Sequence, residues 1–399
     1  MQENEHRVWL EPAVQDWLQA HAYLEPSQIA LQKSPFGERI SPKNLAQQLF
    51  GWQKAKTKLP TYHSTPGIAY PPALSMEQCS SEQTARWKSQ FLKGNLLVDL
   101  TAGLGVDSFF LGENFAQLVA VEQQAPLAEL AQHNLGLLRK NPFQVHQQIA
   151  ENYLSTTPPR ADWIYLDPAR RDAQGGKVFR LADCTPNVVT LLPQLLRYSQ
   201  HILLKTSPLL DIQQALQDLG GAEKVVVLAV KNEVKELLFF LGENATMDPE
   251  ITAVDLYADH ETHFSIKRSG EADCHAQIGP VQNWLFEPNA AVMKTGAFRS
   301  IANQFGLTKL HPNTHLYTGP EIVPGFPGRT YKVLADIAPQ KKALKRVLTE
   351  DKAMVGVRNF PSTPQQLRQK LGVKDGGKHY LMGYTNNEGQ KRLAVMTRQ

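Results

Sequence analysis

Residues 96–112, LLVDLTAGLGVDSFFLG, combine an acid and two glycines at a spacing typical of a nucleotide-binding loop. Asp99 ends an apolar run that predicts a β-strand, and Gly103 and Gly105 follow it in the pattern D-x-x-x-G-x-G. Glycines at a strand-to-helix turn let the backbone turn sharply and approach a ligand closely. Glu122 ends the next predicted strand, so its carboxylate is expected at the same edge of the sheet. The pattern therefore predicts a ligand with a nucleoside part.

Two ligand classes are compatible with such a loop. A dinucleotide site uses G-x-G-x-x-G, with a helix N-terminus facing the diphosphate, but here the third position is Ser108 and Asp107 would place a carboxylate beside the phosphates. S-adenosylmethionine has no phosphate; Asp99 can meet its amino group and Glu122 its ribose hydroxyls. Together with Thr101 and the two glycines, these acids form the predicted cofactor-binding set. The alternative without a ligand is a tight turn followed by a surface glutamate.

A second acidic motif, WIYLDPARR, ends a later predicted strand with Asp167 and Pro168. An exocyclic base amine is a poor nucleophile because its lone pair is delocalised. A carboxylate and a backbone carbonyl that accept its two N–H bonds would turn that lone pair toward a methyl donor. We therefore predict Asp167 and Pro168 as catalytic residues, although Asp167 could instead cap the turn at the end of its strand.

Basic residues near the same edge are candidates for substrate binding. Arg170 can stack on a base or hold a phosphate, and Lys205, in KTSPLLDI after the next strand, can neutralise a phosphate. A plain salt-bridge role for Arg170 and Arg171 remains open. For the lysine segment, the alternative is that Ser207 and Pro208 simply start the next helix.

Strands alternate with amphipathic helices between residues 96 and 242, which predicts an α/β fold with a largely parallel sheet covered on both faces. Only five residues, 231–235, separate the sixth and seventh strands, so the seventh must run antiparallel to the sixth. The strands are expected at 96–102, 118–122, 144–148, 163–167, 201–207, 224–230 and 236–242. Residues 1–80 read as a helical region that ends in a proline-rich connector.

The period of the hydrophobic pattern changes after residue 242. A hairpin is expected over 251–268 and a helix over 295–306, followed by a Pro/Gly-rich boundary near 325. The remaining residues predict a small α+β domain, with helices over 340–348 and 363–372 and four strands.

Charge is distributed unevenly along the chain, although the net charge is only +4. Residues 329–399 hold 15 Lys+Arg against 5 Asp+Glu, which leaves 27 against 33 for the rest. A basic C-terminal domain favours a polyanion as partner, but the charges could also form the solvated faces of ordinary helices. Three widely spaced cysteines fit no metal site. We also expect no membrane span and, without a secretion signal, a cytoplasmic location.

The motifs DLTAGLGVD, DPAR and the antiparallel last strand resemble class I S-adenosylmethionine-dependent methyltransferases. EQCSSEQTA, YLDPARR, KTSPLLDI and KNEVKELLFFLG further resemble the bacterial THUMP-like-domain methyltransferases. This resemblance implies a Rossmann-like methyltransferase sheet with a helical N-terminal region and C-terminal ferredoxin-like and THUMP-like α+β domains. The boundaries we expect are 1–80 for the helical region, 81–245 for the methyltransferase domain, 246–325 for the ferredoxin-like segment and 326–399 for the basic THUMP-like domain.

The resemblance also implies a substrate and two points of departure. THUMP domains recognise structured RNA in tRNA-modifying enzymes, so RNA, such as tRNA or rRNA, is the expected partner. In the class, an Asp after the third strand often contacts adenine; at this place Ala150 and Glu151 are candidates by position only. Amine methyltransferases of nucleic acids commonly carry (D/N)-P-P-(Y/F/W), whereas this chain has Ala169 and Arg170 after Pro168. A small-molecule or protein methyltransferase and a non-catalytic RNA-binding protein therefore remain alternatives.

Overall fold

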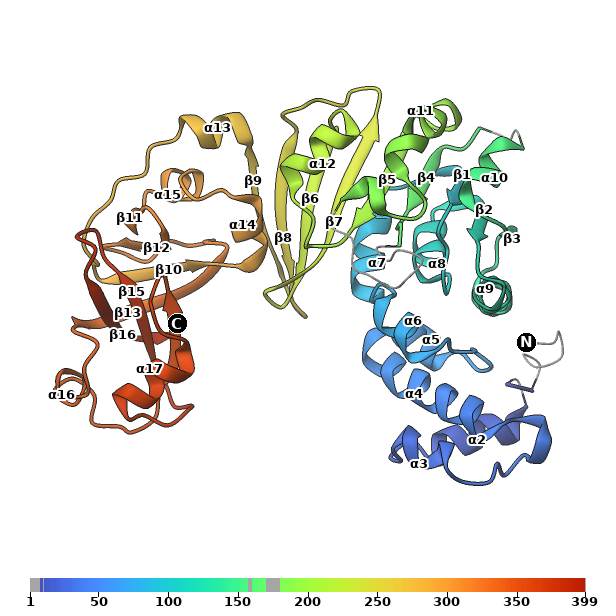
Figure 1. Ribbon diagram of the computed structural model, residues 1–399, viewed down its shortest axis with the longest axis horizontal. Coiled ribbons are helices and arrows are strands. Elements are labelled where there is room, and N and C mark those ends of the chain that lie inside the picture. The colour runs from blue at the N-terminus through green and yellow to red at the C-terminus, as the bar shows by residue number, and fades with distance from the viewer. Residues whose placement is uncertain (1–7, 10, 157–159, 170–179, 399) are drawn as a thin grey trace. The chain divides into compact units, whose positions relative to one another are not determined.

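The computed structural model describes residues 8, 9, 11–156, 160–169 and 180–398, and its chain divides into two compact units (Figure 1). Unit 1 comprises Met1–Glu223 and Leu238–Met247; unit 2 comprises Lys224–Leu237 and Asp248–Gln399. The glycine loop and the Asp-Pro motif belong to unit 1, and the basic C-terminal residues belong to unit 2. Among the described residues, no helix has both the length and the apolar character needed to cross a membrane.

Helices fill the N-terminal part of unit 1, as the sequence predicts. They are α2 (Pro12–Ala20), α3 (Pro26–Ala30), α4 (Pro42–Lys58), α5 (Pro60–Ser64) and α6 (Ala73–Gln78), with a short 3₁₀ turn at Gly37–Arg39. The first four begin with proline, whose fixed φ suits a first helical position that needs no N–H donor. At the start of α4, the Ser41 hydroxyl also accepts a hydrogen bond from the backbone N–H of Asn44.

The larger sheet contains the seven predicted strands. These are β1 (Gly94–Asp99), β2 (Phe115–Glu122), β3 (Phe143–Gln147), β4 (Trp163–Leu166), β5 (His201–Thr206), β6 (Lys224–Val230) and β7 (Glu233–Gly242). The order is β3-β2-β1-β4-β5-β7-β6-β8-β9, and the pairs from β3 to β5 are parallel. Only Lys231 and Asn232 separate β6 from its neighbour β7. Such a tight connection allows only the antiparallel arrangement, so this part of the predicted fold is confirmed.

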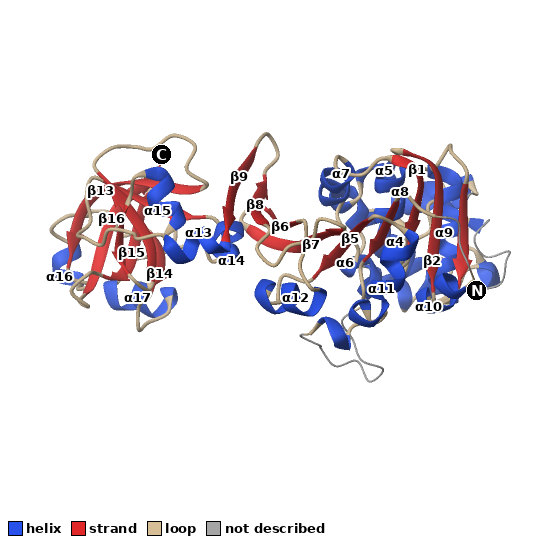
Figure 2. Ribbon diagram, turned by 90° about the horizontal axis from the view of Figure 1, so that it is seen from above, coloured by secondary structure: helices blue, strands red, loops and turns tan. Residues whose placement is uncertain are grey.

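Helices cover both faces of the unit 1 sheet. One face carries α7 (Glu82–Ser89), α8 (Val106–Gly112) and α9 (Ala125–Leu138), and the other carries α10 (Ala150–Ser155), α11 (Val188–Tyr198) and α12 (Ile212–Leu219) (Figure 2). Because the parallel strands all end at the same edge, the loops after β1, β2, β4 and β5 meet there. Asp99, Glu122, Asp167 and Lys205 all lie at or next to these strand ends.

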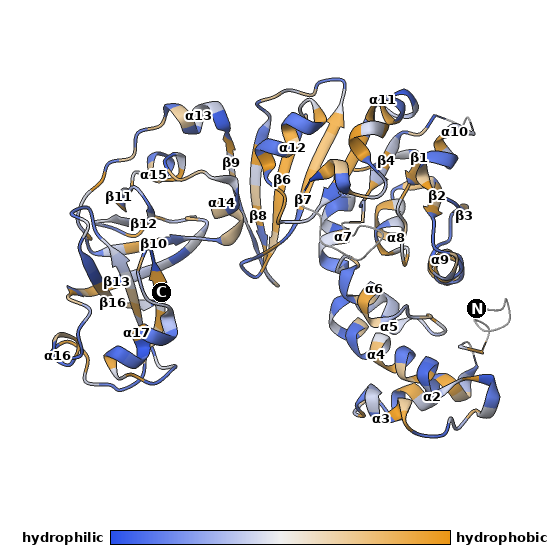
Figure 3. Cartoon of the chain, in the orientation of Figure 1, coloured by the Kyte–Doolittle hydropathy of each residue, from blue (hydrophilic) through white to orange (hydrophobic). Residues whose placement is uncertain are grey.

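Two further strands extend the sheet beyond its expected limit. The hairpin predicted over 251–268 is present as β8 (Glu250–Leu256) and β9 (Glu261–Lys267), which pair antiparallel. β8 also pairs in parallel with β6, which the local sequence pattern did not predict. Strands β6, β7 and β8 are apolar along most of their length (Figure 3), as expected for strands that are buried on both faces.

A seven-stranded sheet forms the rest of unit 2, in the order β11-β12-β10-β13-β16-β15-β14. Its strands are β10 (Trp284–Pro288), β11 (Thr308–His311), β12 (Thr314–Gly319), β13 (Gly328–Ile337), β14 (Met354–Arg358), β15 (His379–Thr385) and β16 (Lys391–Arg398). Alternate residues of β15 enter different cores: Met382 and Tyr384 pack in one cluster, and Leu381 packs in another with Leu344 and Leu367. This alternation shows that both faces of the sheet are covered.

The helices of unit 2 are α13 (Arg268–Asp273), α14 (Ala290–Thr295), α15 (Ser300–Phe305), α16 (Lys341–Leu344) and α17 (Pro364–Leu371). The helix expected over 295–306 is present but starts later, as α15. Gly296, at φ 79°, ends α14, and α15 begins at Ser300. The helix expected over 340–348 is shorter than expected. α16 ends at Leu344, and the chain continues in turns that bond the Lys345 N–H to Lys341 and the Leu348 N–H to Leu344. The domain boundaries at 80, 245 and 325 stay a prediction.

The connector between α5 and α7 binds the sheet-containing part of unit 1 through buried polar contacts. The Asn134 side chain, on α9, donates to the backbone oxygen of Ala69 and accepts from its N–H, both at 2.9 Å. The Tyr62 hydroxyl, from α5, donates to the backbone oxygen of Gly105 in the glycine loop at 3.1 Å. The N-terminal region is therefore attached directly to the loop that the sequence predicts as a ligand site.

We expect Asn134→Ala to destabilise unit 1 by about 2 kcal/mol or more, because both backbone groups of Ala69 would lose their buried partner. Urea unfolding measures the loss, and hydrogen exchange at the Ala69 amide reports it locally. Gln132→Ala is the matched control, since Gln132 is exposed on the same helix. Equal urea midpoints for the two variants would contradict the assigned role of Asn134.

Candidate active site

The glycine loop owes its shape to two left-handed residues. Gly103 has φ 55° and Gly105 has φ 82°, a region that residues with a side chain rarely adopt. Gly105 is the residue before α8, and its N–H donates to the oxygen of Ala102 at 2.8 Å. A Cβ added at Gly103 would meet no atom within 4 Å, so the glycine is required for the turn and the space beside it is open.

Asp99 lies beneath this loop and is fully buried. Its Oδ1 accepts from the Thr101 N–H at 2.9 Å, and its Oδ2 accepts from the Ser108 hydroxyl at 2.5 Å. Burial raises the pKa of Asp99 to about 7, against these hydrogen bonds. In the structure the side chain therefore holds the loop and the start of α8; direct contact with a ligand amino group stays a prediction.

Glu122 is placed by the end of β2 and is oriented by two backbone donors. Its Oε2 accepts from the Gly103 N–H at 2.9 Å, and its Oε1 accepts from the Gln124 N–H at 2.8 Å. A carboxylate offers about four acceptor positions, so Glu122 retains acceptor capacity for a hydroxyl beyond its backbone donors. The Glu122 carboxylate fits the two hydroxyls of a ribose, because its backbone donors orient it and leave acceptor capacity on it. Burial raises the pKa of Glu122.

Asp167 lies directly beside the glycine loop, because its N–H donates to the Thr101 hydroxyl at 2.6 Å. Its Oδ2 forms an ion pair with the Lys205 ammonium at 2.6 Å, and its side chain remains 36% exposed. Pro168 is buried. Burial raises the pKa of Asp167, although the Lys205 ammonium acts to lower it. The structure thus brings together Thr101, from the predicted cofactor set, and Asp167, from the predicted catalytic set.

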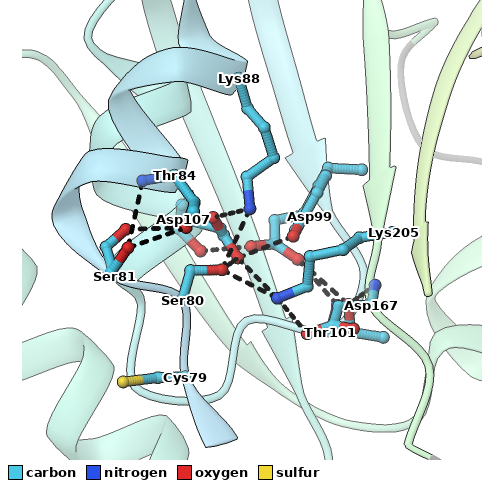
Figure 4. A network of polar contacts seen from close by, with 12 residues as sticks. Cys79, Ser80, Ser81, Thr84, Lys88, Asp99, Thr101, Asp107, Asp167 and Lys205 are labelled. Atoms are coloured by element: carbon cyan, nitrogen blue, oxygen red, sulfur yellow. Dashed lines mark hydrogen bonds and ion pairs between the residues drawn. The ribbon is translucent and has the colours of Figure 1, made fainter. Parts of the chain in front are cut away.

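A buried polar network surrounds Asp107, behind the glycine loop (Figure 4). Its Oδ1 pairs with the Lys88 ammonium at 2.9 Å, and its Oδ2 pairs with Lys205 at 3.2 Å. The hydroxyls of Ser80 and Tyr165 donate to the same Oδ2 at 2.6 and 2.7 Å. Burial acts to raise the pKa of Asp107, but the ammonium groups of Lys205 and Lys88 hold it well below its usual range.

This network corrects our interpretation of Asp107. We expected its carboxylate at the place of a diphosphate, but it is buried and paired with two lysines. The sequence did not predict Ser80, Lys88 or Tyr165 as part of the site. One signal was available: Lys88 follows Thr84, Ala85 and Trp87 on the buried side of a short helix, where a lysine needs an anionic partner.

Lys205 is also placed differently from our expectation. The residue is 5% exposed, and its ammonium contacts Ser80, Asp107 and Asp167. A direct bond to a substrate phosphate would have to replace one of these partners. These contacts therefore favour a role for Lys205 in holding the Asp167 carboxylate over a role in phosphate binding.

The remaining predicted residues lie on two other segments. Ala150 begins α10 and is buried; Gln148, just before it, donates its N–H to the Glu122 backbone oxygen at 3.1 Å. This bond places the segment after β3 beside the predicted ribose site, and an adenine contact by Ala150 or Glu151 stays a prediction. Arg170 and Arg171 lie outside the described residues. In the described ranges, no group of three or more His, Cys, Asp or Glu side chains is arranged to hold a metal.

Comparison with known proteins identifies the family. A model described as THUMP domain-like matches residues 328–399, and one described as a ferredoxin-like domain matches 284–327. A crystal structure of a proposed methyltransferase from Porphyromonas gingivalis W83 is 32% identical, with a TM-score of 0.86 and 98% of each chain covered. The chain belongs to the THUMP-like-domain class I methyltransferases. The predicted family and fold class are thereby confirmed.

The name of a second relative includes a cofactor. A protein of Mycobacterium tuberculosis H37Rv, named as an S-adenosylmethionine-dependent methyltransferase, is 25% identical over 311 residues, which cover 75% of this chain and 80% of that protein. A protein with the same description from strain CDC 1551 matches equally. The chain is an S-adenosylmethionine-dependent methyltransferase, as predicted. The Glu122 carboxylate and the open space at Gly103 fit a bound nucleoside of this kind.

We expect Glu122→Gln to weaken binding of S-adenosylhomocysteine about tenfold, because an amide has one acceptor oxygen where the carboxylate has two. Calorimetry with the 2′-deoxy analogue tests the contact itself: losing the hydroxyl should reduce affinity for the wild type more than for the variant. Glu113→Gln, an exposed residue between α8 and β2, is the control. Equal losses for both proteins would show that Glu122 does not bind the ribose.

Proposed function

We propose that this methyltransferase modifies RNA at an exocyclic base amine, with Asp167 and Pro168 as the catalytic residues. The observation that supports it is the position of Asp167: a partly exposed carboxylate held against the glycine loop by the bond from its N–H to Thr101. Substrate and cofactor must meet within a few ångströms for methyl transfer, and this bond sets the two loops side by side.

The proposed chemistry requires little more than orientation. S-adenosylmethionine supplies an electrophilic methyl group when bound. The Asp167 carboxylate and the Pro168 carbonyl would accept the two N–H bonds of the amine, turning its lone pair toward that methyl and stabilising the cation that forms. The carboxylate can then accept the proton that the methylated amine loses. The raised pKa of Asp167 favours this last step, because it strengthens the carboxylate as a base.

The departure from the usual second proline has a structural counterpart: Ala169 has an N–H that proline lacks. Ala169 exchanges two backbone hydrogen bonds with Thr185, at 2.8 and 3.0 Å. These bonds fix the direction of the chain directly after the motif. Because the next position holds no aromatic, a base that enters this site would need a different stacking partner. Arg170 is our candidate from the sequence.

RNA as the substrate is supported by the THUMP-like match and by the charges within it. Four of its acids, Asp336, Glu350, Asp351 and Asp375, are already paired with basic side chains. By contrast, α16 and the two residues after it present Lys341, Lys342, Lys345 and Arg346 to solvent, with no ion-pair partner within the described chain. Unpaired cations so close together favour phosphate binding over a merely solvated helix face.

Methyl transfer to RNA is the first test of the proposal. With radiolabelled S-adenosylmethionine and RNA from cells that lack the protein, the wild type should label a base. Asp167→Ala should lower kcat about 100-fold or more while S-adenosylhomocysteine still binds. Asp218→Ala, on the surface of α12, is the control. Labelling of a protein or a small molecule in place of RNA would refute the substrate, and full activity of Asp167→Ala would refute the site.

The double variant Lys342→Gln/Lys345→Gln should weaken RNA binding about three- to tenfold and reduce the salt dependence of log K by up to about 2 units. Lys374→Gln/Lys378→Gln is the matched control: it removes the same charge from the same domain, but at lysines paired with Asp351 and Glu350. Filter binding across a salt series measures both. A larger effect from the control pair would place the RNA surface elsewhere.

A further inference from the structure

The buried ammonium of Lys205 contacts the oxygens of three polar side chains. Its ammonium lies 2.6 Å from Oδ2 of Asp167, 2.8 Å from the Ser80 hydroxyl and 3.2 Å from Oδ2 of Asp107. An ammonium has three N–H donors, and these three oxygens match that number. Lys205 is therefore held in one orientation, and it holds the Asp167 carboxylate in turn.

Asp107 is the second carboxylate that holds the Lys205 ammonium, in addition to Asp167. It is bound at Oδ1 by Lys88 and at Oδ2 by Ser80 and Tyr165, so its carboxylate cannot rotate without breaking several bonds. Lys88 also donates to the Ser80 hydroxyl at 3.0 Å. Two lysines and two aspartates thus form a cluster without net charge, which lowers the cost of burying four ionised groups.

We propose that Lys205 is a positioning residue for methyl transfer: it fixes Oδ2 of Asp167 so that Oδ1 meets the substrate amine, and Asp107, with Lys88 and Ser80, fixes Lys205. The proposal rests on the function proposed above, in which Asp167 accepts an N–H bond of the amine. It assigns Lys205, which we first expected to contact a phosphate, to the orientation and ionisation of the carboxylate.

The charge of Lys205 matters as much as its shape. Among the described residues, the ionisable groups that act on Asp167 are Lys205 from β5, Asp107 from α8, Lys88 from α7 and Asp99 from β1. An ionised Asp167 accepts N–H bonds at both oxygens, whereas protonation turns one oxygen into a donor. Burial opposes ionisation, and Lys205 supports it. Without the lysine, the pKa of Asp167 rises, and activity is lost from the acid side at a higher pH.

The experiment compares Lys205→Met, Lys205→Arg and Lys205→Met/Asp107→Asn in the full chain. We expect Lys205→Met to lower kcat for RNA methylation at least tenfold and to move the acid limb of the kcat–pH profile upward, with KM for S-adenosylmethionine little changed. Lys205→Arg should recover part of both effects. Lys58→Met is the control, since Lys58 is a nearby lysine that donates to backbone oxygens.

The double variant separates positioning from simple charge balance. Lys205→Met leaves Asp107 with one cation fewer and can reduce stability, whereas the added Asp107→Asn restores a neutral cluster of Lys88 and Asp167. We expect the urea midpoint to recover and kcat to stay low. Recovery of both would overturn the proposal, as would an unchanged pH profile in Lys205→Met.

A measurement without substrate keeps this inference distinct from the proposed function. In protein labelled with carboxyl-¹³C aspartate, the Asp167 resonance, assigned by its loss in Asp167→Asn, should titrate at higher pH in Lys205→Met than in the wild type. An unshifted titration would overturn the role of Lys205 even where RNA is methylated. A shifted titration without RNA methylation by the wild type would refute the proposed substrate alone.

Discussion

The burial of the Asp107 carboxylate is the constraint on which the architecture of the active site depends. An ionised carboxylate inside a protein without cationic partners costs several kcal/mol, so its position at the start of α8 requires cations around it. The structure supplies them from α7 and β5, with hydroxyls from Ser80 and Tyr165. Helix α7, the strand end at Asp167 and the glycine loop therefore have to assemble together, and the N-terminal segment that carries Ser80 is part of the candidate site.

This constraint explains which parts of the site were predictable. Strands, the glycine turn and the acids at the ends of β1, β2 and β4 follow from local features: hydrophobic period, positive φ and the common edge of a parallel sheet. Asp107 and Lys205 are 98 residues apart, and nothing in their local sequence indicates that they meet. We therefore placed Asp107 toward the ligand and Lys205 toward a phosphate, although each is the other's buried partner.

The same limit applies to the fold of unit 2. The hairpin β8–β9 was predictable from two short apolar runs, but the parallel pairing of β8 with β6 joins segments separated by an entire strand and its connections. Local chemistry misled us in the helices as well. The apolar spacing over 295–306 suggested one helix, yet Gly296 ends α14 in a left-handed conformation that favours glycine. Here the hydrophobic period favoured a continuous helix, but the helix-ending glycine determined where α14 stops.

For the RNA substrate proposed above, the contacts of Lys205 change where the affinity has to arise. A lysine paired with two aspartates contributes little to phosphate binding. The described strand ends next to the glycine loop therefore offer a carboxylate acceptor for the proposed amine but few cations for the backbone of the proposed RNA. The unpaired lysines and arginine at α16 can supply that sequence-independent affinity. Binding energy from parts of a substrate remote from the reacting atom can be used to orient that atom. In this protein the lysine at the strand ends is paired with Asp107 and Asp167. Such a site depends on remote contacts more than a site whose lysines bind phosphates beside the reacting atom.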